Sequence, residues 1–229
     1  MVTSTGTTFV PWRTTKGSTT HVNAMTKVVI DMTMSLDGFV AGPGDGKQFA
    51  LGQHGGEAIF DWYTSGDKEV QTPLFKPEPG ANREQVERMF SESGAYIFGR
   101  RTYDFANGWN GRHPVNGAPV FILTHKPPPA SEVPKGPSNL TFVTDGIESA
   151  VRQAKAVAGG KDVKLGGSSP GKAALVAGLV DEILVHIAPY LMGGGVRLFD
   201  DLPDGIRLEK LSVDDGHLAT HIRYRVMKG

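Results

Sequence analysis

Three short stretches of the sequence combine residue types that bind phosphate. Arginine forks match phosphate oxygens in pairs, lysine adds a point charge, and hydroxyl groups donate further hydrogen bonds. Glycine lets the backbone approach a ligand closely, and the N-terminus of a helix attracts an anion. The candidate phosphate-binding residues are Gly99, Arg100, Arg101, Thr102, Thr124, His125, Lys126, Gly166, Gly167, Ser168 and Ser169.

Two of the three stretches also have a purely structural interpretation. The Arg100-Arg101 pair fits a solvated basic turn paired with Asp104, and the Gly166-Gly167 pair fits a tight turn from strand to helix that binds nothing. The spacing of the glycines matches neither the Rossmann nor the Walker pattern. Phosphate binding therefore depends on whether the three stretches meet in space.

Asp37, Asp61 and Trp109 are three further candidate site residues, and each could instead have a purely structural role. Asp37 precedes Gly38, so it is either a turn residue that bonds its own backbone or part of a loop that closes over a ligand. Asp61 fits a surface or capping position. Trp109 stands in the glycine-rich loop Gly108-Trp109-Asn110-Gly111, either as a lid over a flat ligand or as a loop anchor.

The elements around these residues alternate between strand and helix patterns. Runs of apolar residues, or of alternating apolar and polar residues, predict strands. Apolar residues that recur every three or four positions predict helices. Asn82 followed by Gln85 resembles a capping box, and Ser169 before Pro170 is a plausible N-cap. A helical turn is expected near residues 57–63, with Ile59, Phe60 and Tyr63 on one face. The predicted strands are residues 27–34, 95–98, 119–124, 140–143, 162–165, 183–188, 208–213 and 218–226.

This order predicts a mixed α/β sheet that ends in two consecutive strands. The three phosphate-suited stretches follow strands, and ligands of open α/β sheets sit at the carboxyl ends of the strands. Together they suggest a phosphorylated nucleotide at one edge of the sheet.

Composition narrows the class of protein. The 229 residues carry a formal net charge of zero, which argues against a nucleic-acid or acidic-membrane partner. No apolar run reaches membrane-spanning length. The chain has no cysteine, so disulfides and thiolate metal sites are excluded, no metal is expected, and a reducing cytoplasm fits. Residues 1–24 are rich in Ser and Thr and predict a flexible tail before a single domain over residues 25–229.

Six motifs in order resemble the dihydrofolate-reductase-like superfamily. The nearest branch is the reductase domain of bifunctional riboflavin-biosynthesis deaminase-reductases and its stand-alone relatives, and the resemblance covers about residues 27–227. The chain lacks the cysteines of the deaminase zinc site. The motifs are Met-Ser-Leu-Asp-Gly-Phe-Val-Ala-Gly (34–42), Gly-Arg-Arg-Thr-Tyr-Asp (99–104), Pro-Val-Phe-Ile-Leu-Thr-His (119–125), Gly-Gly (166–167), Gly-Leu-Val-Asp-Glu (178–182) and Pro-Tyr-Leu-Met-Gly-Gly-Gly-Val-Arg-Leu-Phe (189–199).

This resemblance implies a mostly parallel sheet with flanking helices, NADPH binding and hydride transfer. Residues 99–102 would meet the adenosine and pyrophosphate, residues 124–126 the 2′-phosphate, and residues 166–169 the pyrophosphate. Met34 and Ala41 would lie near the nicotinamide, and Asp37, Phe39 and Trp109 near the substrate. Asp37 and Asp61 are the candidate catalytic acids. The stretch from 43 to 82 is longer than such a reductase needs.

Two functions remain open on the sequence. The first is an NADPH-dependent reductase of a pyrimidine, pterin or other small heterocyclic or carbonyl substrate, such as 5-amino-6-(5-phosphoribosylamino)uracil. The second is a nucleotide-binding module of the same fold without catalysis. A ligand pocket beside the nicotinamide, lined by Asp37 and Trp109, would favour the reductase, and a filled pocket would favour the module.

A homodimer is expected as well. Stand-alone relatives in this superfamily are often dimers. The last predicted strand, residues 218–226, is long, and no later helix pattern could cover it. A long strand at a sheet edge invites pairing unless it is covered.

Overall fold

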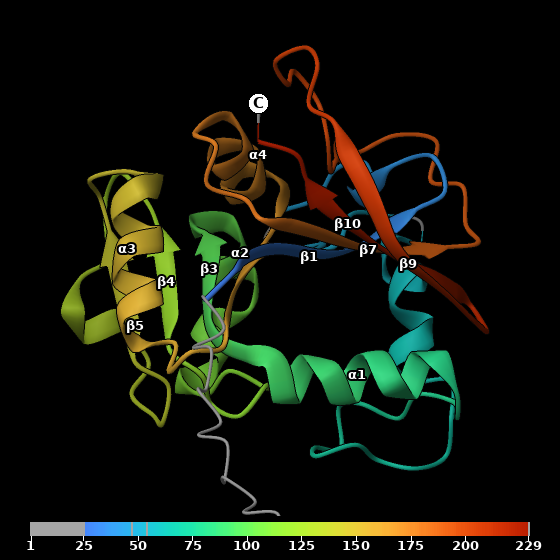
Figure 1. The fold of residues 1–229 in the computed structure, drawn as a ribbon. Coiled ribbons are helices and arrows are strands. Elements are labelled where there is room, and N and C mark those ends of the chain that lie inside the picture. The colour runs from blue at the N-terminus through green and yellow to red at the C-terminus, as the bar shows by residue number, and fades with distance from the viewer. Residues whose placement is uncertain (1–25, 47, 54, 229) are drawn as a thin grey trace, which may run out of the picture.

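The computed structural model describes residues 26–46, 48–53 and 55–228. The predicted tail, residues 1–24, lies outside the described residues. Figure 1 shows the central sheet with helices on both of its faces. No helix in the described part of the chain is long and apolar enough to cross a membrane.

Eight strands form one sheet in the order β5-β4-β3-β6-β1-β7-β10-β9. Neighbouring strands from β5 to β7 are parallel, whereas β10 runs antiparallel to both β7 and β9. The predicted mixed, mostly parallel sheet with an antiparallel C-terminal hairpin is therefore confirmed. The strands are β1 (Val28–Ser35), β3 (Ser93–Gly99), β4 (Val120–Leu123), β5 (Leu140–Val143), β6 (Asp162–Gly166), β7 (Glu182–Ala188), β9 (Leu208–Gly216) and β10 (Ala219–Val226).

A second, two-stranded sheet pairs β2 (Phe39–Ala41) with β8 (Val196–Arg197). It brings the Asp37-Gly38 turn beside the glycine cluster at residues 193–195. The remaining elements are helices. They are η1 (Gly56–Tyr63), η2 (Asn107–Gly111) and η3 (Ala130–Glu132), which are 3₁₀ helices, and α1 (Ala81–Glu92), α2 (Arg100–Phe105), α3 (Ile147–Val157) and α4 (Ser168–Val176).

Alternation along the strands divides the core between the two faces of the sheet. In β3, Ala95 and Ile97 point to the cluster that includes α3 and α4, whereas Tyr96 points to the cluster that includes η1 and α1. The first cluster is mostly aliphatic, with buried Ile30 and Leu165. The second holds most of the buried aromatic rings, Trp62 and Phe90 among them. The two faces thus have different chemistry.

The structure corrects three local predictions. The helix α1 begins at Ala81 with Gly80 as its N-cap, because the Asn82 and Gln85 side chains bond His217 and Asp214 of the β9–β10 hairpin instead of capping. Gly167, not Ser169, precedes α4.

The third correction concerns η1. Its buried residues are Gly56, Ile59 and Trp62, so the face predicted from Ile59, Phe60 and Tyr63 is wrong. The tighter 3₁₀ winding places residues three apart on one side, which brings Trp62 into the core.

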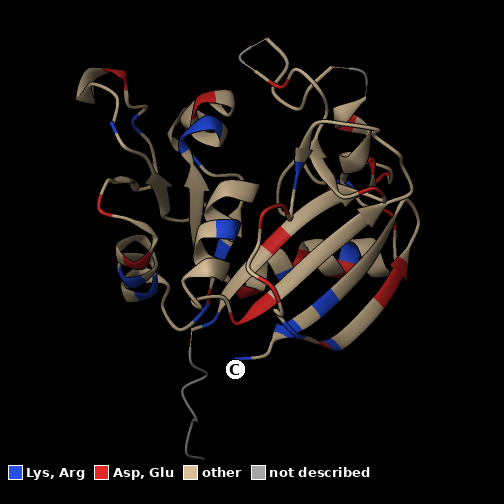
Figure 2. Cartoon of the chain, turned by 90° about the horizontal axis from the view of Figure 1, so that it is seen from above, with Lys and Arg blue, Asp and Glu red and all other residues tan. Residues whose placement is uncertain are grey.

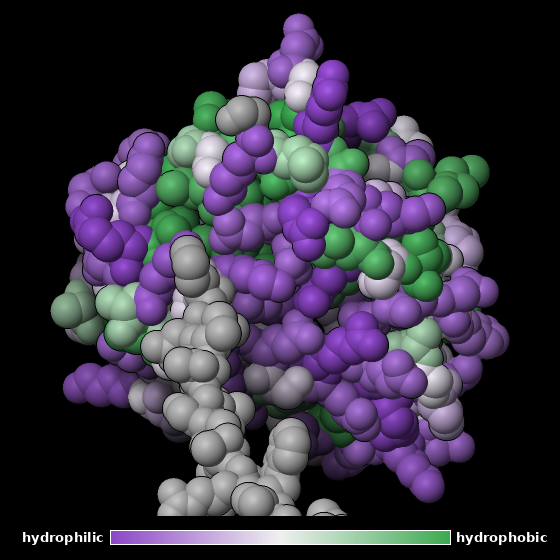
Figure 3. Space-filling model, viewed as in Figure 1, coloured by the Kyte–Doolittle hydropathy of each residue, from purple (hydrophilic) through white to green (hydrophobic). Residues whose placement is uncertain are grey.

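Charges of both signs are interspersed over the elements, as Figure 2 shows. In Figure 3 apolar side chains reach the surface in the upper half of the view, where α4 and the C-terminal strands lie in Figure 1. Large exposed apolar residues include Val176 of α4 and Leu208, Leu211 and Val213 of β9.

Candidate active site

The three phosphate-suited stretches meet at the carboxyl edge of β4, β3 and β6, which are neighbours in the sheet. The Arg100 Nη1 donates to the carbonyl oxygen of Lys126 at 2.6 Å, which joins the first stretch to the second. A Cβ placed on Gly167 would stand 3.4 Å from the Thr102 hydroxyl, so the first stretch also touches the third. The sequence-predicted residues 99–102, 124–126 and 166–169 therefore form one surface.

The turn between β6 and α4 has the shape of an anion cradle. Gly167 has a φ of 92°, a conformation that favours glycine, and a Cβ on Gly166 would collide with the Phe98 ring. The α4 helix begins at Ser168, and its first N–H groups lack partners within the helix. Backbone donors, glycines and nearby cations fit the pyrophosphate of a dinucleotide such as NADPH.

The two arginines are already oriented by carboxylates. Arg100 Nε lies 2.9 Å from Asp104 Oδ1, and Arg101 Nη2 lies 2.6 Å from Asp45 Oδ2. The structural interpretation with Asp104 is thus confirmed for Arg100, and it leaves further guanidinium donors for a phosphate. His125 and Lys126 are exposed, and the Thr124 hydroxyl accepts the amide hydrogen of Lys126 at 3.3 Å.

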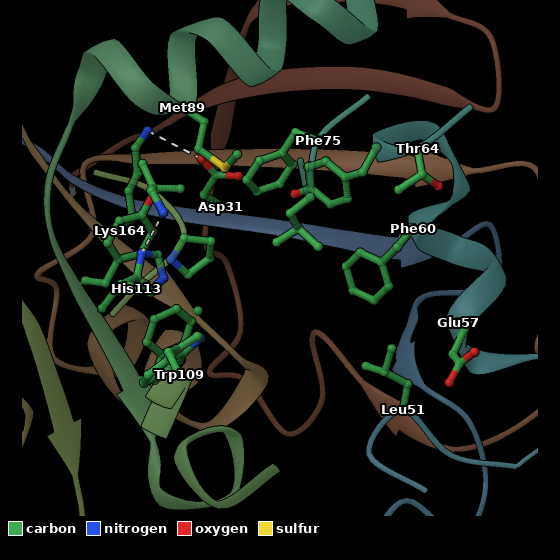
Figure 4. Close-up of a pocket in the computed structure, with 18 of the residues that line it drawn as sticks. Asp31, Leu51, Glu57, Phe60, Thr64, Phe75, Met89, Trp109, His113 and Lys164 are labelled. Atoms are coloured by element: carbon green, nitrogen blue, oxygen red, sulfur yellow. Dashed lines mark hydrogen bonds and ion pairs between the residues drawn. The ribbon is translucent and has the colours of Figure 1, made fainter. Parts of the chain in front are cut away.

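A cavity of about 660 Å³ opens beside this edge, on the aromatic face of the sheet (Figure 4). Phe98 and Gly166 belong to its wall and directly precede Gly99 and Gly167, so the cavity adjoins the cradle. Its lining residues are Asp31, Leu51, Glu57, Phe60, Asp61, Tyr63, Thr64, Leu74, Phe75, Met89, Tyr96, Phe98, Trp109, His113, Pro114, Val115, Lys164, Leu165 and Gly166.

Trp109 is part of the cavity wall. It has a φ of 51° within η2, and its ring lies 4.9 Å from that of Phe98 and 5.4 Å from that of His113. Glycines on either side, Gly108 and Gly111, take the positive φ that this turn needs. Trp109 therefore lines the cavity, and its role as a lid over a flat ligand stays a prediction.

Asp31 and Lys164 form the charged end of the cavity, opposite Glu57 (Figure 4). Lys164 is almost fully buried, and its Nζ lies 3.5 Å from Asp31, 3.4 Å from Asp162 and 3.9 Å from Glu92. Sequence reasoning missed both residues. The signal was a charge in the middle of an apolar strand, as in Val28-Val29-Ile30-Asp31, since a buried charge persists only when it is paired.

A chain of hydrogen bonds leads from Asp31 into the protein. Asp31 Oδ1 lies 3.0 Å from His186 Nε2, His186 Nδ1 lies 2.7 Å from His221 Nδ1, and His221 Nε2 lies 2.9 Å from Asn82 Oδ1. The Trp62 ring packs on both imidazoles, at 4.6 and 4.8 Å. His186 is buried, and both of its ring nitrogens have hydrogen-bond partners.

The directions of these bonds fix where the protons lie. Asn82 Nδ2 donates to the carbonyl oxygen of His217 at 2.6 Å, so Asn82 Oδ1 accepts from His221 Nε2. His221 Nδ1 then has a lone pair and accepts from His186 Nδ1. Two lone pairs cannot face each other at 3.0 Å, so one proton is held between His186 Nε2 and Asp31 Oδ1.

The pKa shifts agree with this assignment. Burial, with the neighbouring His186 charge, lowers the pKa of His221 to about 3, so that ring is neutral. Burial alone would raise the pKa of Asp31, but Lys164 and His186 outweigh it and hold that pKa below its usual range. Burial and the Asp31 charge raise the pKa of the nearby Tyr63 hydroxyl. The Asp31–His186 pair therefore carries a full carboxylate charge with one proton beside it.

Asp37 lies apart from the cavity wall. Its carboxylate accepts the Ser35 hydroxyl at 2.6 Å and the amides of Met192 at 3.0 Å and Gly193 at 2.7 Å. The Ser35 hydroxyl and these amides hold the pKa of Asp37 at about 2. Asp37 thus ties the β1–β2 turn to the glycine cluster.

The other predicted residues divide between the wall and the core. Asp61 lines the cavity and is exposed. Phe39 and Ala41 are buried in β2, and Met34 is at the end of β1; none of the three lines the cavity. Arg197 lies over the Phe39 ring at 4.5 Å.

Comparisons with solved structures show the same fold. A putative riboflavin biosynthesis protein from Shewanella sp. PV-4 is 20% identical, with a TM-score of 0.61, over 88% of this chain and 99% of that one. A pyrimidine reductase-like protein from Corynebacterium diphtheriae is 15% identical, with a TM-score of 0.55, over 90% and 94%. A search of curated proteins gives no match.

A bifunctional protein from Thermotoga maritima has the same fold in part. It is a diaminohydroxyphosphoribosylaminopyrimidine deaminase/5-amino-6-(5-phosphoribosylamino)uracil reductase, 15% identical with a TM-score of 0.54. The match covers 89% of this chain and 57% of that one. In sequence, residues 26–218 match the model of the RibD C-terminal domain. This match extends over most of the chain, which therefore belongs to the RibD C-terminal domain family.

Proposed function

We propose that this protein is an NADPH-dependent reductase of a small heterocyclic substrate. The observation that carries the proposal is the cavity of about 660 Å³, which adjoins a surface of glycines, cations and helix N–H groups suited to a dinucleotide. The reductase-like family supports an oxidoreductase. The names of the related proteins suggest a pyrimidine-like ring as substrate.

When bound, NADPH would supply a hydride. Residues 99–102 and 166–169 would hold its pyrophosphate and adenosine, and Lys126 with His125 would contact the 2′-phosphate. Phe98 and Gly166 connect this surface to the cavity, so a ring in the cavity would lie next to the cofactor. The aromatic wall would exclude water and orient that ring.

Reduction of a C=N, C=C or C=O bond by hydride also consumes one proton. Asp31 lines the cavity, and one proton lies between its Oδ1 and His186 Nε2. We propose that this pair delivers the proton to the substrate atom next to the reduced carbon and that solvent then restores it. Asp61, the acid suggested by the sequence, stands on the same wall and is the alternative donor.

The non-catalytic nucleotide-binding module is less well supported. A module would be expected to have its substrate space filled by side chains, and here a cavity is present. Of the two residues expected to line it, Trp109 does and Asp37 does not. The chain has no cysteine, and a reducing cytoplasm stays our prediction for its compartment.

The test is NADPH oxidation against a panel of pterins, pyrimidines and quinones, followed by Asp31→Asn. General acid catalysis contributes about 10²–10⁴-fold, so kcat should fall by about 10²-fold or more while NADPH affinity is retained. Asp162→Asn is the matched control, because Asp162 also pairs with Lys164 at 3.4 Å but does not line the cavity.

Two results would count against this assignment. If Asp61→Asn abolishes turnover and Asp31→Asn does not, the proton comes from Asp61. If no member of the panel is reduced although NADPH binds, the module is the better description.

A further inference from the structure

The wall of the cavity is made of flat rings. Tyr96 and Phe98 stack at 5.7 Å with nearly parallel planes, and Trp109 and His113 continue the surface from Phe98. Phe60, Tyr63 and Phe75 come from the segment between β2 and α1. Such a wall favours a flat aromatic or heteroaromatic ligand, because rings pack face to face or edge to face.

The charges on the wall are mostly negative. Asp31, Glu57 and Asp61 contribute carboxylates. Among the described residues, Lys164 is the only lysine or arginine in the lining, and three carboxylates within 4 Å already surround its ammonium group. Burial lowers the pKa of His113 to about 4, so its imidazole is neutral at pH 7.

The cations of this region stand elsewhere. Arg100 and Arg101 belong to α2 and Lys126 follows β4, and none of the three lines the cavity. Figure 4 shows Glu57 at one end of the cavity, beside Leu51, with Asp31 and Lys164 at the other. A phosphate on a ligand in this cavity would meet carboxylates without a free cation among the described lining residues.

We propose that the cavity takes a flat, neutral or cationic heteroaromatic molecule without a phosphate group. This inference rests on the proposed function and narrows its substrate class. It departs from the phosphoribosylated uracil expected from the family resemblance. The Asp31 carboxylate, next to His186, offers an acceptor for a ring N–H at the charged end.

Matched ligand pairs test the inference by binding alone. Riboflavin with FMN, and thiamine with thiamine monophosphate, differ only by the phosphate. Each would be titrated into the full chain by calorimetry, without cofactor. We expect the member without phosphate to bind in at least one pair, and its phosphate ester to bind at least about tenfold more weakly, because like charges placed together oppose binding.

A double variant makes the test specific to the wall. In the pair that binds, Glu57→Lys with Asp61→Lys should narrow the difference in affinity between the ligand and its phosphate ester by about tenfold, since it replaces two wall carboxylates with cations. Glu132→Lys with Asp204→Lys makes the same change of charge at exposed positions outside the lining and should leave the difference unaltered.

Equal or tighter binding of the phosphate esters by the unmodified chain would overturn the inference, and so would no binding by either unphosphorylated ligand. NADPH binding is measured separately. If NADPH fails to bind while the ligand pairs behave as expected, the proposed cofactor is wrong and the assignment of the cavity stands.

Discussion

At the scale of single residues, the site depends on charges that are buried and paired. Lys164 and Asp31 sit inside strands, where an unpaired charge would be strongly unfavourable. Hydrogen bonds connect Asp31 to His186, His186 to His221, and His221 to Asn82. Each of these bonds determines which ring nitrogen of the next histidine carries a proton. The arrangement therefore holds one proton next to the cavity without a mobile side chain.

Two buried neutral histidines predict how stability depends on pH. Burial lowers the pKa of His113 to about 4 and, together with His186, that of His221 to about 3. In the unfolded chain both rings take up protons below about pH 6.5. Folding then excludes those protons, so stability is lost as pH falls from 6.5 toward 4.

Urea unfolding at pH 7 and pH 5 would measure this loss, which we expect to be about 2–4 kcal/mol. His113→Phe should remove about half of the difference between the two pH values. A free energy of unfolding that is equal at both would contradict the burial of neutral rings.

At the scale of elements, the segment between β2 and α1 explains why the chain is longer here than a simple reductase needs. It contributes Leu51, Glu57, Phe60, Tyr63 and Phe75 to the cavity. Its η1 helix also brings Trp62 onto the two histidines. The extra length therefore builds part of the cavity wall.

The β6–α4 turn gives a prediction for cofactor binding. Gly167→Ala places a methyl group 3.4 Å from the Thr102 hydroxyl, in the cradle, and should weaken NADPH binding by about tenfold or more. Gly178→Ala is the matched control, because its φ of 67° is also strained for alanine but its Cβ would meet open space.

Both alanine variants should lower the melting temperature by similar amounts, since each loses about 1–3 kcal/mol to strain. Fluorescence titration with NADPH distinguishes them. Equal NADPH affinities for the two variants would show that the turn is only structural.

Much of the fold, and the meeting of the three phosphate-suited stretches, could be predicted from the sequence. Strand and helix patterns alternate, and residues 99–102, 124–126 and 166–169 follow strands that turned out to be neighbours. The hydrogen-bonded residues at the charged end of the cavity could not be predicted, because they depend on contacts between distant parts of the sequence. Asp31, His186, His221 and Asn82 come from four elements, and nothing in their local spacing links them.

Asn82 shows why a local motif can mispredict the partner of a side chain. Its spacing to Gln85 predicted a capping box, but the hairpin of β9 and β10 takes both side chains. The partners of Asp37 could not be predicted from its local sequence either, because its carboxylate accepts hydrogen bonds from amides more than 150 residues away. A local motif cannot show which distant group will compete for a side chain.

In the whole molecule, β9 is the edge strand of the large sheet. The strand that the sequence suggested as the edge, residues 218–226, is β10 and lies between β7 and β9, so that expectation is wrong. Leu208, Leu211 and Val213 on β9 are 44%, 37% and 50% exposed. An exposed apolar edge is a pairing hazard, and a second copy of the chain around a two-fold axis would cover it. The homodimer expected from the sequence thus stays our prediction, with β9 as its proposed contact.

Light scattering tests the dimer. The unmodified chain should give about twice its 24.5 kDa mass, and Leu211→Lys with Val213→Lys should reduce that mass toward the monomer. Val157→Lys, at a position on α3 that is also 50% exposed, is the control and should not change it. A monomer at tens of micromolar, for the unmodified chain, would rule the dimer out.

We propose above that NADPH binds at the carboxyl edge of β4, β3 and β6, beside the cavity. The most direct measurement is calorimetric titration of the unmodified chain with NADPH and with NADH, repeated on Arg100→Ala with Lys126→Ala. We expect NADPH to bind about tenfold or more tightly than NADH, and the double variant to lose most of that preference, because a charge-assisted contact contributes about 1.5–3 kcal/mol. No binding of NADPH, or equal affinities for the two cofactors in the unmodified chain, would contradict the claim.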